Sequence, residues 1–268
     1  MKIRDIASMI EQRAPLHMQE DYDNAGMQVG CLDDTVKGIL LCTDVSLDIV
    51  DEAIEGGYNL IISHHPLIFR GLKKITGRTI VESIVARAIK HDINIYCAHT
   101  NMDNTPGGVS WRMASKLGMT DVTILDPHPT GDTLADGMPV LAGCGVVGNV
   151  TPMPAPLFLK LLKDTFEVGA VRYSGCTDKT ITRVALCGGA GGFLVDKAVS
   201  CNADVFVTAD LRYHDFLDHN REILMADIGH YESEHYTKEI FLEIIQEKNP
   251  NFAVAFAKNE KNQIQFYI

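Results

Sequence analysis

The chain lacks features that would indicate a membrane protein or a disulfide-stabilised protein. It has no run of about 18 apolar residues, so we expect no membrane-spanning helix. The first residues, MKIRDIASMIEQRAP, lack the apolar core and the cleavage site of a signal peptide. The seven cysteines form no CxxC pair, and their odd number argues against a disulfide framework. We therefore expect reduced, buried thiols in a cytoplasmic protein.

Basic residues are also scarce. The chain has 24 Lys and Arg against 35 Asp and Glu, which gives a net charge of −11. Most of such a surface repels a nucleic-acid backbone, so we do not expect a nucleic-acid partner unless positive potential is concentrated locally. The one local basic cluster, Arg70-Gly71-Leu72-Lys73-Lys74, is either a solvated loop or a phosphate contact.

The glycine-rich run 188–192 (GGAGG) is not a P-loop. It lacks the Gly-Lys-Ser/Thr ending of that motif, and it lacks the context of a dinucleotide-binding GxGxxG. A tight turn from a strand into a helix is the favoured reading. Amides at the start of the following helix could still accept a phosphate.

Helix and strand signals alternate along the chain. Helix patterns at 46–56 and 78–91 lie between strand patterns at 36–42, 58–63 and 93–98. Further helices are predicted at 3–13, 107–117, 156–166, 191–201, 211–219 and 232–247, and further strands at 144–150, 169–174, 181–187, 204–208, 223–227, 252–257 and 263–268. This alternation predicts an α/β fold with mixed sheets and flanking helices.

The second half of the chain resembles the first. Aligning Cys42 with Cys187, an offset of 145, matches Leu60 with Val205 without a gap. At an offset of 131, the run from His99 to Asp103 matches His230 to Glu234, and both runs read His-x-x-x-acid after an apolar strand. We therefore predict an internal duplication, with one α/β half in residues 1–125 and the other in 126–268. Since ligands bind at the carboxyl ends of strands in such folds, a site is expected in the cleft between the halves.

Three clusters of candidate metal ligands follow predicted strands. His64-His65 leaves the strand 58–63, although one ring could instead be bonded in the core and the other solvated. Asp103 follows the strand 93–98, although it could simply cap a loop. His230 and Glu234 lie one helical turn apart if a helix has begun by His230, although acidic residues also favour helix N-termini.

Together these residues are three imidazoles and two carboxylates, the set His64, His65, Asp103, His230 and Glu234. Nitrogen and oxygen ligands of this kind suit Zn, Fe, Mn, Co or Ni. The number of ligands favours two divalent ions per chain that share and activate a hydroxide. His99 and His214 are candidate catalytic residues that shuttle protons, and His214 is equally well explained as a surface residue of a helix.

At these residues the chain resembles the NIF-three-like dinuclear-metal-centre proteins, also labelled GTP cyclohydrolase I type-two-like. The matching segments run in order from residue 23 to 234: 23–30 (DNAGMQVG), 63–66 (SHHP), 98–103 (AHTNMD) with 107–108, 188–192, 203–210, and 229–231 with Glu234. The resemblance implies two α/β halves around a two-metal site with the same five ligands. It also implies a ring-shaped homohexamer, a trimer of dimers. The extra domain that some relatives insert between the halves is not expected here.

The leading hypothesis is a metal-dependent hydrolase of a nucleotide or a similar phosphorylated small molecule. The family label suggests opening of the GTP ring, with a metal-bridging hydroxide as the nucleophile. The rival hypothesis is a non-catalytic metal-binding scaffold or protein-interaction ring, and a weaker one is a nucleic-acid-processing partner. A hydrolase needs exchangeable water on the metals, whereas a scaffold does not.

Overall fold

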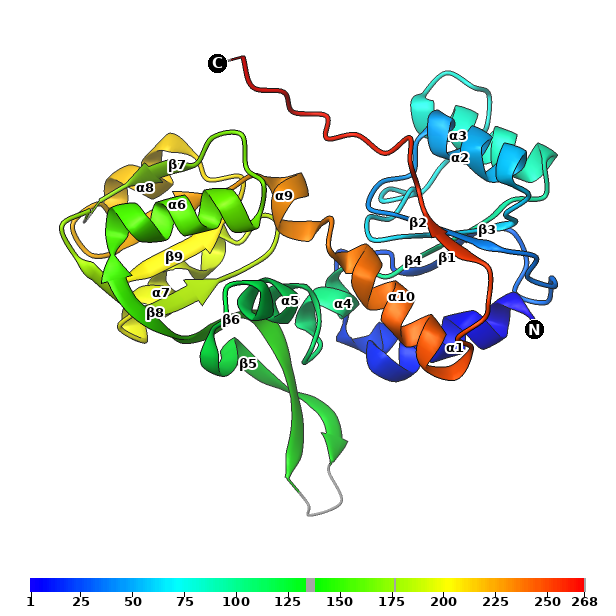
Figure 1. Cartoon of the computed structure of the whole chain (residues 1–268). Coiled ribbons are helices and arrows are strands. Elements are labelled where there is room, and N and C mark those ends of the chain that lie inside the picture. Colours follow the sequence, from blue (N-terminus) through cyan, green and yellow to red (C-terminus); the bar gives the residue numbers. More distant parts are fainter. Residues whose placement is uncertain (134–137, 176, 268) are drawn as a thin grey trace. The chain divides into compact units, whose positions relative to one another are not determined.

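The computed structural model describes residues 1–133, 138–175 and 177–267, and it divides into two compact units (Figure 1). Unit 1 comprises Met1–Met102 and Thr237–Gln263, and unit 2 comprises Asp103–Tyr236 and Ile264–Ile268. The predicted division between residues 125 and 126 differs from these boundaries. That point falls inside a long strand of unit 2, and the chain later returns to unit 1.

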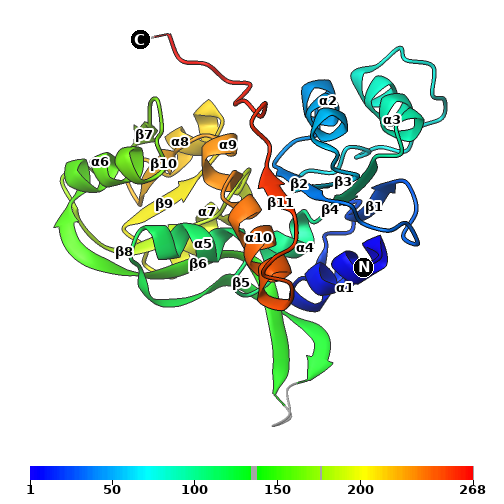
Figure 2. The same cartoon turned by 45° about the vertical axis from the view of Figure 1, so that its right-hand side comes forward.

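Unit 1 is built on a five-stranded mixed sheet. Its elements are α1 (Ile3–Arg13), a 3-10 turn (Leu16–Met18), β1 (Gly26–Val29), β2 (Ile39–Cys42), α2 (Leu47–Gly56), β3 (Leu60–Ser63), α3 (Ile80–Lys90), β4 (Asn94–Cys97), the start of α4 (Thr100–Asn104), α10 (Thr237–Lys248) and β11 (Val254–Phe256). The strand order is β1-β4-β3-β2-β11, with only β1 antiparallel to its neighbour. Helices α2 and α3 cover one face of the sheet, and α1 and α10 cover the other (Figures 1 and 2).

The sequence explains these elements of unit 1. In α1 the buried residues Ile3, Ile6, Ala7 and Ile10 recur at helical spacing, which gives the helix one apolar face. Strands β2, β3 and β4 are buried at every position, as expected for parallel strands covered on both faces. Because β11 pairs in parallel with β2, the segment Thr237–Gln263 belongs to unit 1.

Unit 2 is built on a six-stranded mixed sheet. Its elements are the end of α4, α5 (Val109–Lys116), β5 (Thr120–Thr133), β6 (Pro139–Pro154), α6 (Ala155–Thr165), β7 (Arg172–Ser174), β8 (Thr180–Leu186), a 3-10 turn η2 (Gly192–Leu194), α7 (Val195–Ser200), β9 (Val205–Thr208), α8 (Tyr213–Asp218), β10 (Leu224–Asp227) and α9 (His230–Glu234). The strand order is β5-β6-β8-β9-β10-β7, in which β8, β9 and β10 are parallel.

Side chains on the two faces of this sheet enter different cores. In β9, Val205 and Val207 pack in the core that includes Phe158 of α6, whereas Phe206 packs with Leu194 and Ala198 on the other face. Successive strand residues point to opposite faces, so one short apolar strand fills both cores. The predicted α/β class, with mixed sheets and flanking helices, is confirmed.

The two units share a strand order. In the unit 1 order β2-β3-β4-β1, the first three strands are parallel and β1 is antiparallel to β4. In the unit 2 order β8-β9-β10-β7, the first three strands are likewise parallel and β7 is antiparallel to β10. Ile39 lies opposite Leu60, and Val184 lies opposite Val205, so the pairing register keeps the offset of 145. This agreement is what a duplication would produce, and the duplication itself stays a prediction.

Some predicted elements differ from the structure. Strands β5 and β6 form a long hairpin that extends beyond the rest of unit 2 (Figures 1 and 2), whereas the sequence predicted only a strand at 144–150. The predicted helix 232–247 is divided into α9 and α10, and residues 263–267 form no strand. Cys42, Cys97 and Cys187 are buried as expected, but Cys31 is exposed, and Cys176 lies outside the described residues.

Candidate metal site

The parallel strands of unit 1 deliver their following residues to one edge of the sheet. Cys42, Ser63 and Cys97 are paired in register at the carboxyl ends of β2, β3 and β4. The chain then continues into Asp44 after β2, into His64 and His65 after β3, and into His99 after β4. These side chains therefore lie where ligands bind in parallel α/β sheets.

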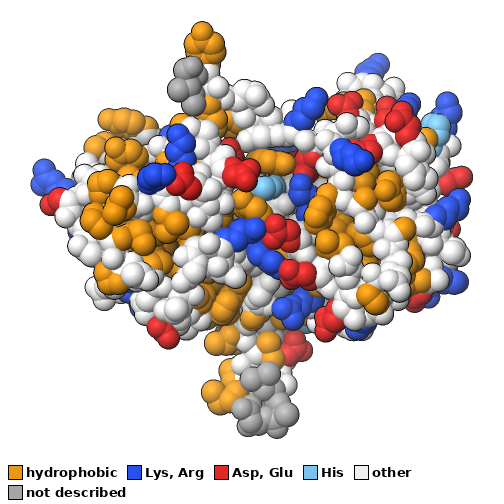
Figure 3. Space-filling view, in the orientation of Figure 1, with side chains coloured by type: hydrophobic (Ala, Val, Ile, Leu, Met, Phe, Trp, Pro, Cys, Tyr) orange, Lys and Arg blue, Asp and Glu red, His pale blue; other side chains and the backbone are white. Residues whose placement is uncertain are grey.

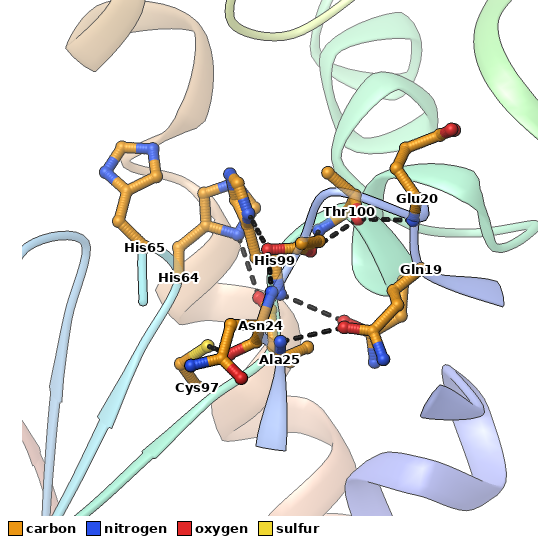
Figure 4. Close-up of polar contacts among 12 residues, drawn as sticks. Gln19, Glu20, Asn24, Ala25, His64, His65, Cys97, His99 and Thr100 are labelled. Carbon is orange, nitrogen blue, oxygen red and sulfur yellow. Dashed lines mark hydrogen bonds and ion pairs between the residues drawn. The ribbon is translucent and has the colours of Figure 1, made fainter. Parts of the chain in front are cut away.

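His64, His65 and His99 form a histidine cluster (Figure 4). One ring nitrogen from each can be chosen so that all three lie within 4.8 Å of one another, which is the spacing of ligands around one ion. The ring centroids are 5.0 Å apart for His64 and His65 and 5.4 Å apart for His64 and His99. The sequence predicted His64 and His65 as ligands but gave His99 a catalytic role.

Each of these rings is oriented through its Nδ1 atom. His64 Nδ1 donates to the Ala98 carbonyl at 3.0 Å, His65 Nδ1 to the Asp44 carboxylate at 2.8 Å, and His99 Nδ1 to a carboxylate at the same distance. Carbonyl and carboxylate oxygens only accept hydrogen bonds, so the Nδ1 atoms carry the protons. In a neutral ring, Nε2 then presents the lone pair that a metal ligand requires.

The carboxylate that holds His99 is Asp23, which also fixes the start of α4. Its Oδ2 accepts from Thr100 N at 3.0 Å and from Thr100 Oγ1 at 2.5 Å. Burial alone would raise the pKa of Asp23, but the hydrogen bonds from His99 and Thr100 outweigh it and hold that pKa well below its usual range. Asp23 is therefore ionised at neutral pH and is a permanent acceptor for His99.

Unit 2 contributes its own cluster at the end of β10. His230 begins α9, and its Nε2 lies 2.9 Å from Oε2 of Glu234 one turn later. Its Nδ1 is held by Asp210 at 2.7 Å, so His230 repeats the pattern of the histidines in unit 1. An oxygen of Asp103, on α4, lies within 4.8 Å of an oxygen of Glu234. Unit 2 thus brings together all three of its predicted ligands.

The GGAGG run packs directly against Glu234. Gly189 has a φ of +61°, and a Cβ there would lie 2.1 Å from Oε1 of Glu234. The amide of Gly189 donates to Ser233 Oγ at 2.9 Å, and the amide of Gly191 donates to Thr208 Oγ1 at 2.9 Å. These amides are used inside unit 2, which supports the tight-turn reading of the motif. The turn leaves space for a carboxylate that a larger residue would displace.

The remaining predicted catalytic residue is not in either cluster. His214 is exposed on α8, and its ring contact in the described part of the chain is with Tyr213, at 5.5 Å between centroids. Sequence reasoning missed the three aspartates that orient histidines, Asp23, Asp44 and Asp210. Asp44 and Asp210 each follow an apolar strand, which is the same signal that singled out the candidate ligands.

The donor chemistry fits divalent transition metals. Each unit offers imidazole nitrogen, and unit 2 adds carboxylate oxygen, with the rings already oriented by oxygen acceptors. Such orienting partners are a regular feature of metal-bound histidine. A metal centre of Zn, Fe, Mn, Co or Ni is compatible with this set.

The hydrogen bond from His65 to Asp44 gives a direct test of this orientation. We expect Asp44→Asn to weaken metal affinity by about 10- to 100-fold, since loss of an orienting partner has this effect at metal sites. Competition with a chromogenic chelator measures the affinity. Asp48→Asn, in the first turn of α2, is the matched control and should leave it unchanged. Equal affinities for Asp44→Asn and the parent would show that Asp44 does not orient a ligand.

Comparison with known proteins gives consistent matches over nearly the whole chain. A family model described as Duf34/NIF3 (NGG1p interacting factor 3) matches residues 1–263. A Clostridium perfringens protein named "GTP cyclohydrolase 1 type 2 homolog" is 35% identical over 236 residues, 87% of each chain. A Lactococcus lactis protein of the same name is 31% identical over 272 residues, covering 100% of this chain and 99% of its own. The crystal structure of Staphylococcus aureus protein SA1388 matches with a TM-score of 0.88 at 29% identity, over 100% of this chain and 99% of that one.

Two further observations bear on partners. No helix in the described residues is long and apolar enough to span a membrane. On the face seen in Figure 3, basic side chains lie among acidic ones instead of forming a continuous basic surface.

Proposed function

Since the chain belongs to the Duf34/NIF3 family, we propose that it is a metal-dependent hydrolase of a nucleotide or a similar phosphorylated small molecule. It would use two divalent metal ions, held by His64, His65, Asp103, His230 and Glu234. The relatives' printed name, "GTP cyclohydrolase 1 type 2 homolog", makes GTP the first substrate to test.

The observation that carries the proposal is the shared orientation of the histidines. His64, His65 and His230 each use Nδ1 to donate to an oxygen acceptor and so keep Nε2 for another partner. A structural histidine in a core needs no such uniform arrangement. Three rings oriented alike, with Glu234 beside one of them, are best explained by metal binding.

The chain's own residues then have distinct tasks. Bound divalent metals would lower the pKa of water and polarise a phosphoryl or carbonyl oxygen. His99, oriented by Asp23 and about one-sixth exposed (17%), would accept and return a proton at Nε2. Asp44 and Asp210 would keep the rings of His65 and His230 in place.

Turnover by fully metallated protein tests the proposal. The protein would be loaded separately with Zn, Mn, Fe, Co and Ni and offered GTP, other nucleotides and phosphoesters. Hydrolysis above the rate of a His65→Ala control supports the proposal. Full metal occupancy without turnover of any substrate would contradict it and favour a non-catalytic metal-binding scaffold.

His99 has a separable role in this scheme. We expect His99→Gln to lower kcat by about 100-fold or more with the metal content unchanged, because it removes the proton carrier and not a ligand. Elemental analysis and steady-state kinetics on the same sample measure both quantities. His91→Gln, at the exposed end of α3, is the control. Loss of a metal ion in His99→Gln would instead make His99 a third nitrogen ligand in unit 1.

A homohexamer and a cytoplasmic location belong to the same proposal. Both come from the sequence, the first from the family resemblance and the second from the cysteine usage. Light scattering coupled to size-exclusion chromatography should give about six times the chain mass of 29.5 kDa. A monomer at micromolar concentration would contradict the assembly without affecting the metal-site proposal.

A further inference from the structure

Two exposed aromatic rings of unit 1 lie next to each other, and one of them lies beside the histidine cluster. Tyr22 is 64% exposed and Phe69 is 46% exposed. Their centroids are 6.4 Å apart with the rings tilted by 56°, and Phe69 is also 6.4 Å from the ring of His99. Exposed aromatic side chains next to convergent polar groups commonly mark a ligand site.

The backbone next to Phe69 is held in place by the 23–30 motif. Asn24 Nδ2 donates to the Ile68 carbonyl at 2.6 Å, and the Ile68 amide donates to Gln28 Oε1 at 3.1 Å. Gln28 Nε2 in turn donates to the Asn24 carbonyl at 2.6 Å. Both backbone groups of Ile68 are therefore fixed by one motif. This gives Asn24 and Gln28 a role in positioning Phe69, while Asp23 of the same motif positions His99.

Positive charge follows immediately in the chain. Arg70, Lys73 and Lys74 are exposed, and none of them forms an ion pair with a carboxylate in the described part of the chain. In a chain of net charge −11, three unpaired basic residues that closely follow Phe69 in the sequence are complementary to an anion. Aromatic rings beside unpaired cations are the arrangement that recognises a nucleotide.

We propose that Tyr22 and Phe69 bind the base of a nucleotide and that Arg70, Lys73 and Lys74 attract its phosphates. The base stacks on an aromatic ring, since every base has a π-face, and the rest of the nucleotide is directed toward the histidine cluster. This inference rests on the proposed function for its chemistry, and it specifies which substrate class the site recognises. The ligand is a free nucleotide, because the acidic chain as a whole repels a long polyanion.

Binding of GTP and ATP, compared with inorganic triphosphate, tests the stacking. We expect Phe69→Ala to weaken GTP and ATP binding by about 5- to 150-fold, the range for loss of one stacked base, and to leave triphosphate binding unchanged. Tyr22→Ala should have the same selective effect. Arg70→Gln should weaken all three ligands equally. Phe193→Ala, another exposed phenylalanine (67%), is the matched control.

A fluorescent variant reports the contact itself. The tryptophan fluorescence of Phe69→Trp should be quenched by GTP and not by inorganic triphosphate. Wild type is the reference, since its fluorescence comes from Trp111, the single native tryptophan. The proposal is overturned if neither nucleotide binds wild type, if Phe69→Ala and Tyr22→Ala both bind GTP within twofold of wild type, or if triphosphate quenches equally. It is also overturned if an oligonucleotide binds more tightly than GTP, or if Phe69→Ala loses an assembly that wild type forms.

These measurements distinguish a failure of the recognition site from a failure of the proposed hydrolase. Phe69-dependent binding of GTP without hydrolysis would contradict the hydrolase and leave this recognition site standing. Hydrolysis of a non-nucleotide phosphoester at the wild-type rate by Phe69→Ala, with unchanged nucleotide affinity, would remove the recognition site and leave the hydrolase standing.

Discussion

We expect a His64→Ala variant to lose its bound metal and to lower any turnover by more than about 100-fold. Loss of a partner that only orients a ligand has a smaller effect, about 10- to 100-fold. His64 is fully buried at the end of β3, and its Nδ1 is committed to the Ala98 carbonyl. Water cannot readily replace an imidazole at such a position. The loss of this ring removes a proposed ligand whose orientation is set by the fold.

Thermal unfolding with and without metal separates the ligand role from simple packing. Metal at 100 times its Kd stabilises a folded protein by about 2.7 kcal/mol, so metal should raise the Tm of wild type. In the presence of a chelator, the Tm of His64→Ala should differ from that of wild type only because the packing of the ring is lost. Added metal should then leave its Tm unchanged. His91→Ala, an exposed histidine, should behave as wild type, and a normal metal-dependent rise in His64→Ala would show that His64 is not a ligand.

The Gly189→Ala variant is expected to displace a candidate ligand within unit 2. A Cβ at Gly189 would lie 2.1 Å from Glu234 Oε1 and 3.0 Å from its carboxyl carbon, so the carboxylate must move. The left-handed backbone at φ +61° adds a cost of about 1–2 kcal/mol for a residue with a Cβ. We expect both a loss of stability and at least a tenfold loss of metal affinity.

Gly118→Ala is a closely matched control for this experiment. Gly118 also lies in unit 2, has a φ of +66°, and has nothing within 4 Å of its absent Cβ. Gly118→Ala should lose the stability that a left-handed backbone costs, and it should keep its metal affinity. Chemical denaturation measures the first quantity and chelator competition the second. Equal metal affinities in Gly118→Ala and Gly189→Ala would show that the turn does not set the position of Glu234.

The sequence singles out the candidate ligands of each unit because they interrupt a strong pattern. An apolar strand that ends in His64-His65 is unusual, whereas a single aspartate such as Asp44 after a strand is common. The roles of Asp44 and Asp210 become visible only when the fold brings them to His65 and His230. Likewise, no sequence signal separates a glycine needed for a turn from one, like Gly189, that also makes room for a neighbour.

Packing explains the parts of the fold that the sequence did not predict. Strand β5 is mostly exposed and contains Pro127 and Pro129, so its alternating pattern is hidden, and its pairing with β6 decides its conformation. The predicted helix 232–247 is broken because its parts enter different cores. Tyr236 packs on Phe166 in unit 2, whereas Phe241 is buried in unit 1.

The central proposal is that His64, His65, Asp103, His230 and Glu234 hold one pair of metal ions. The most direct measurement is the number of metal ions per chain, by elemental mass spectrometry on protein purified without a metal-chelating tag. His65→Ala, in unit 1, and Glu234→Ala, in unit 2, would be measured beside it. We predict two ions in wild type and the loss of both in either variant. No metal in wild type, or a loss confined to one variant, would contradict the account.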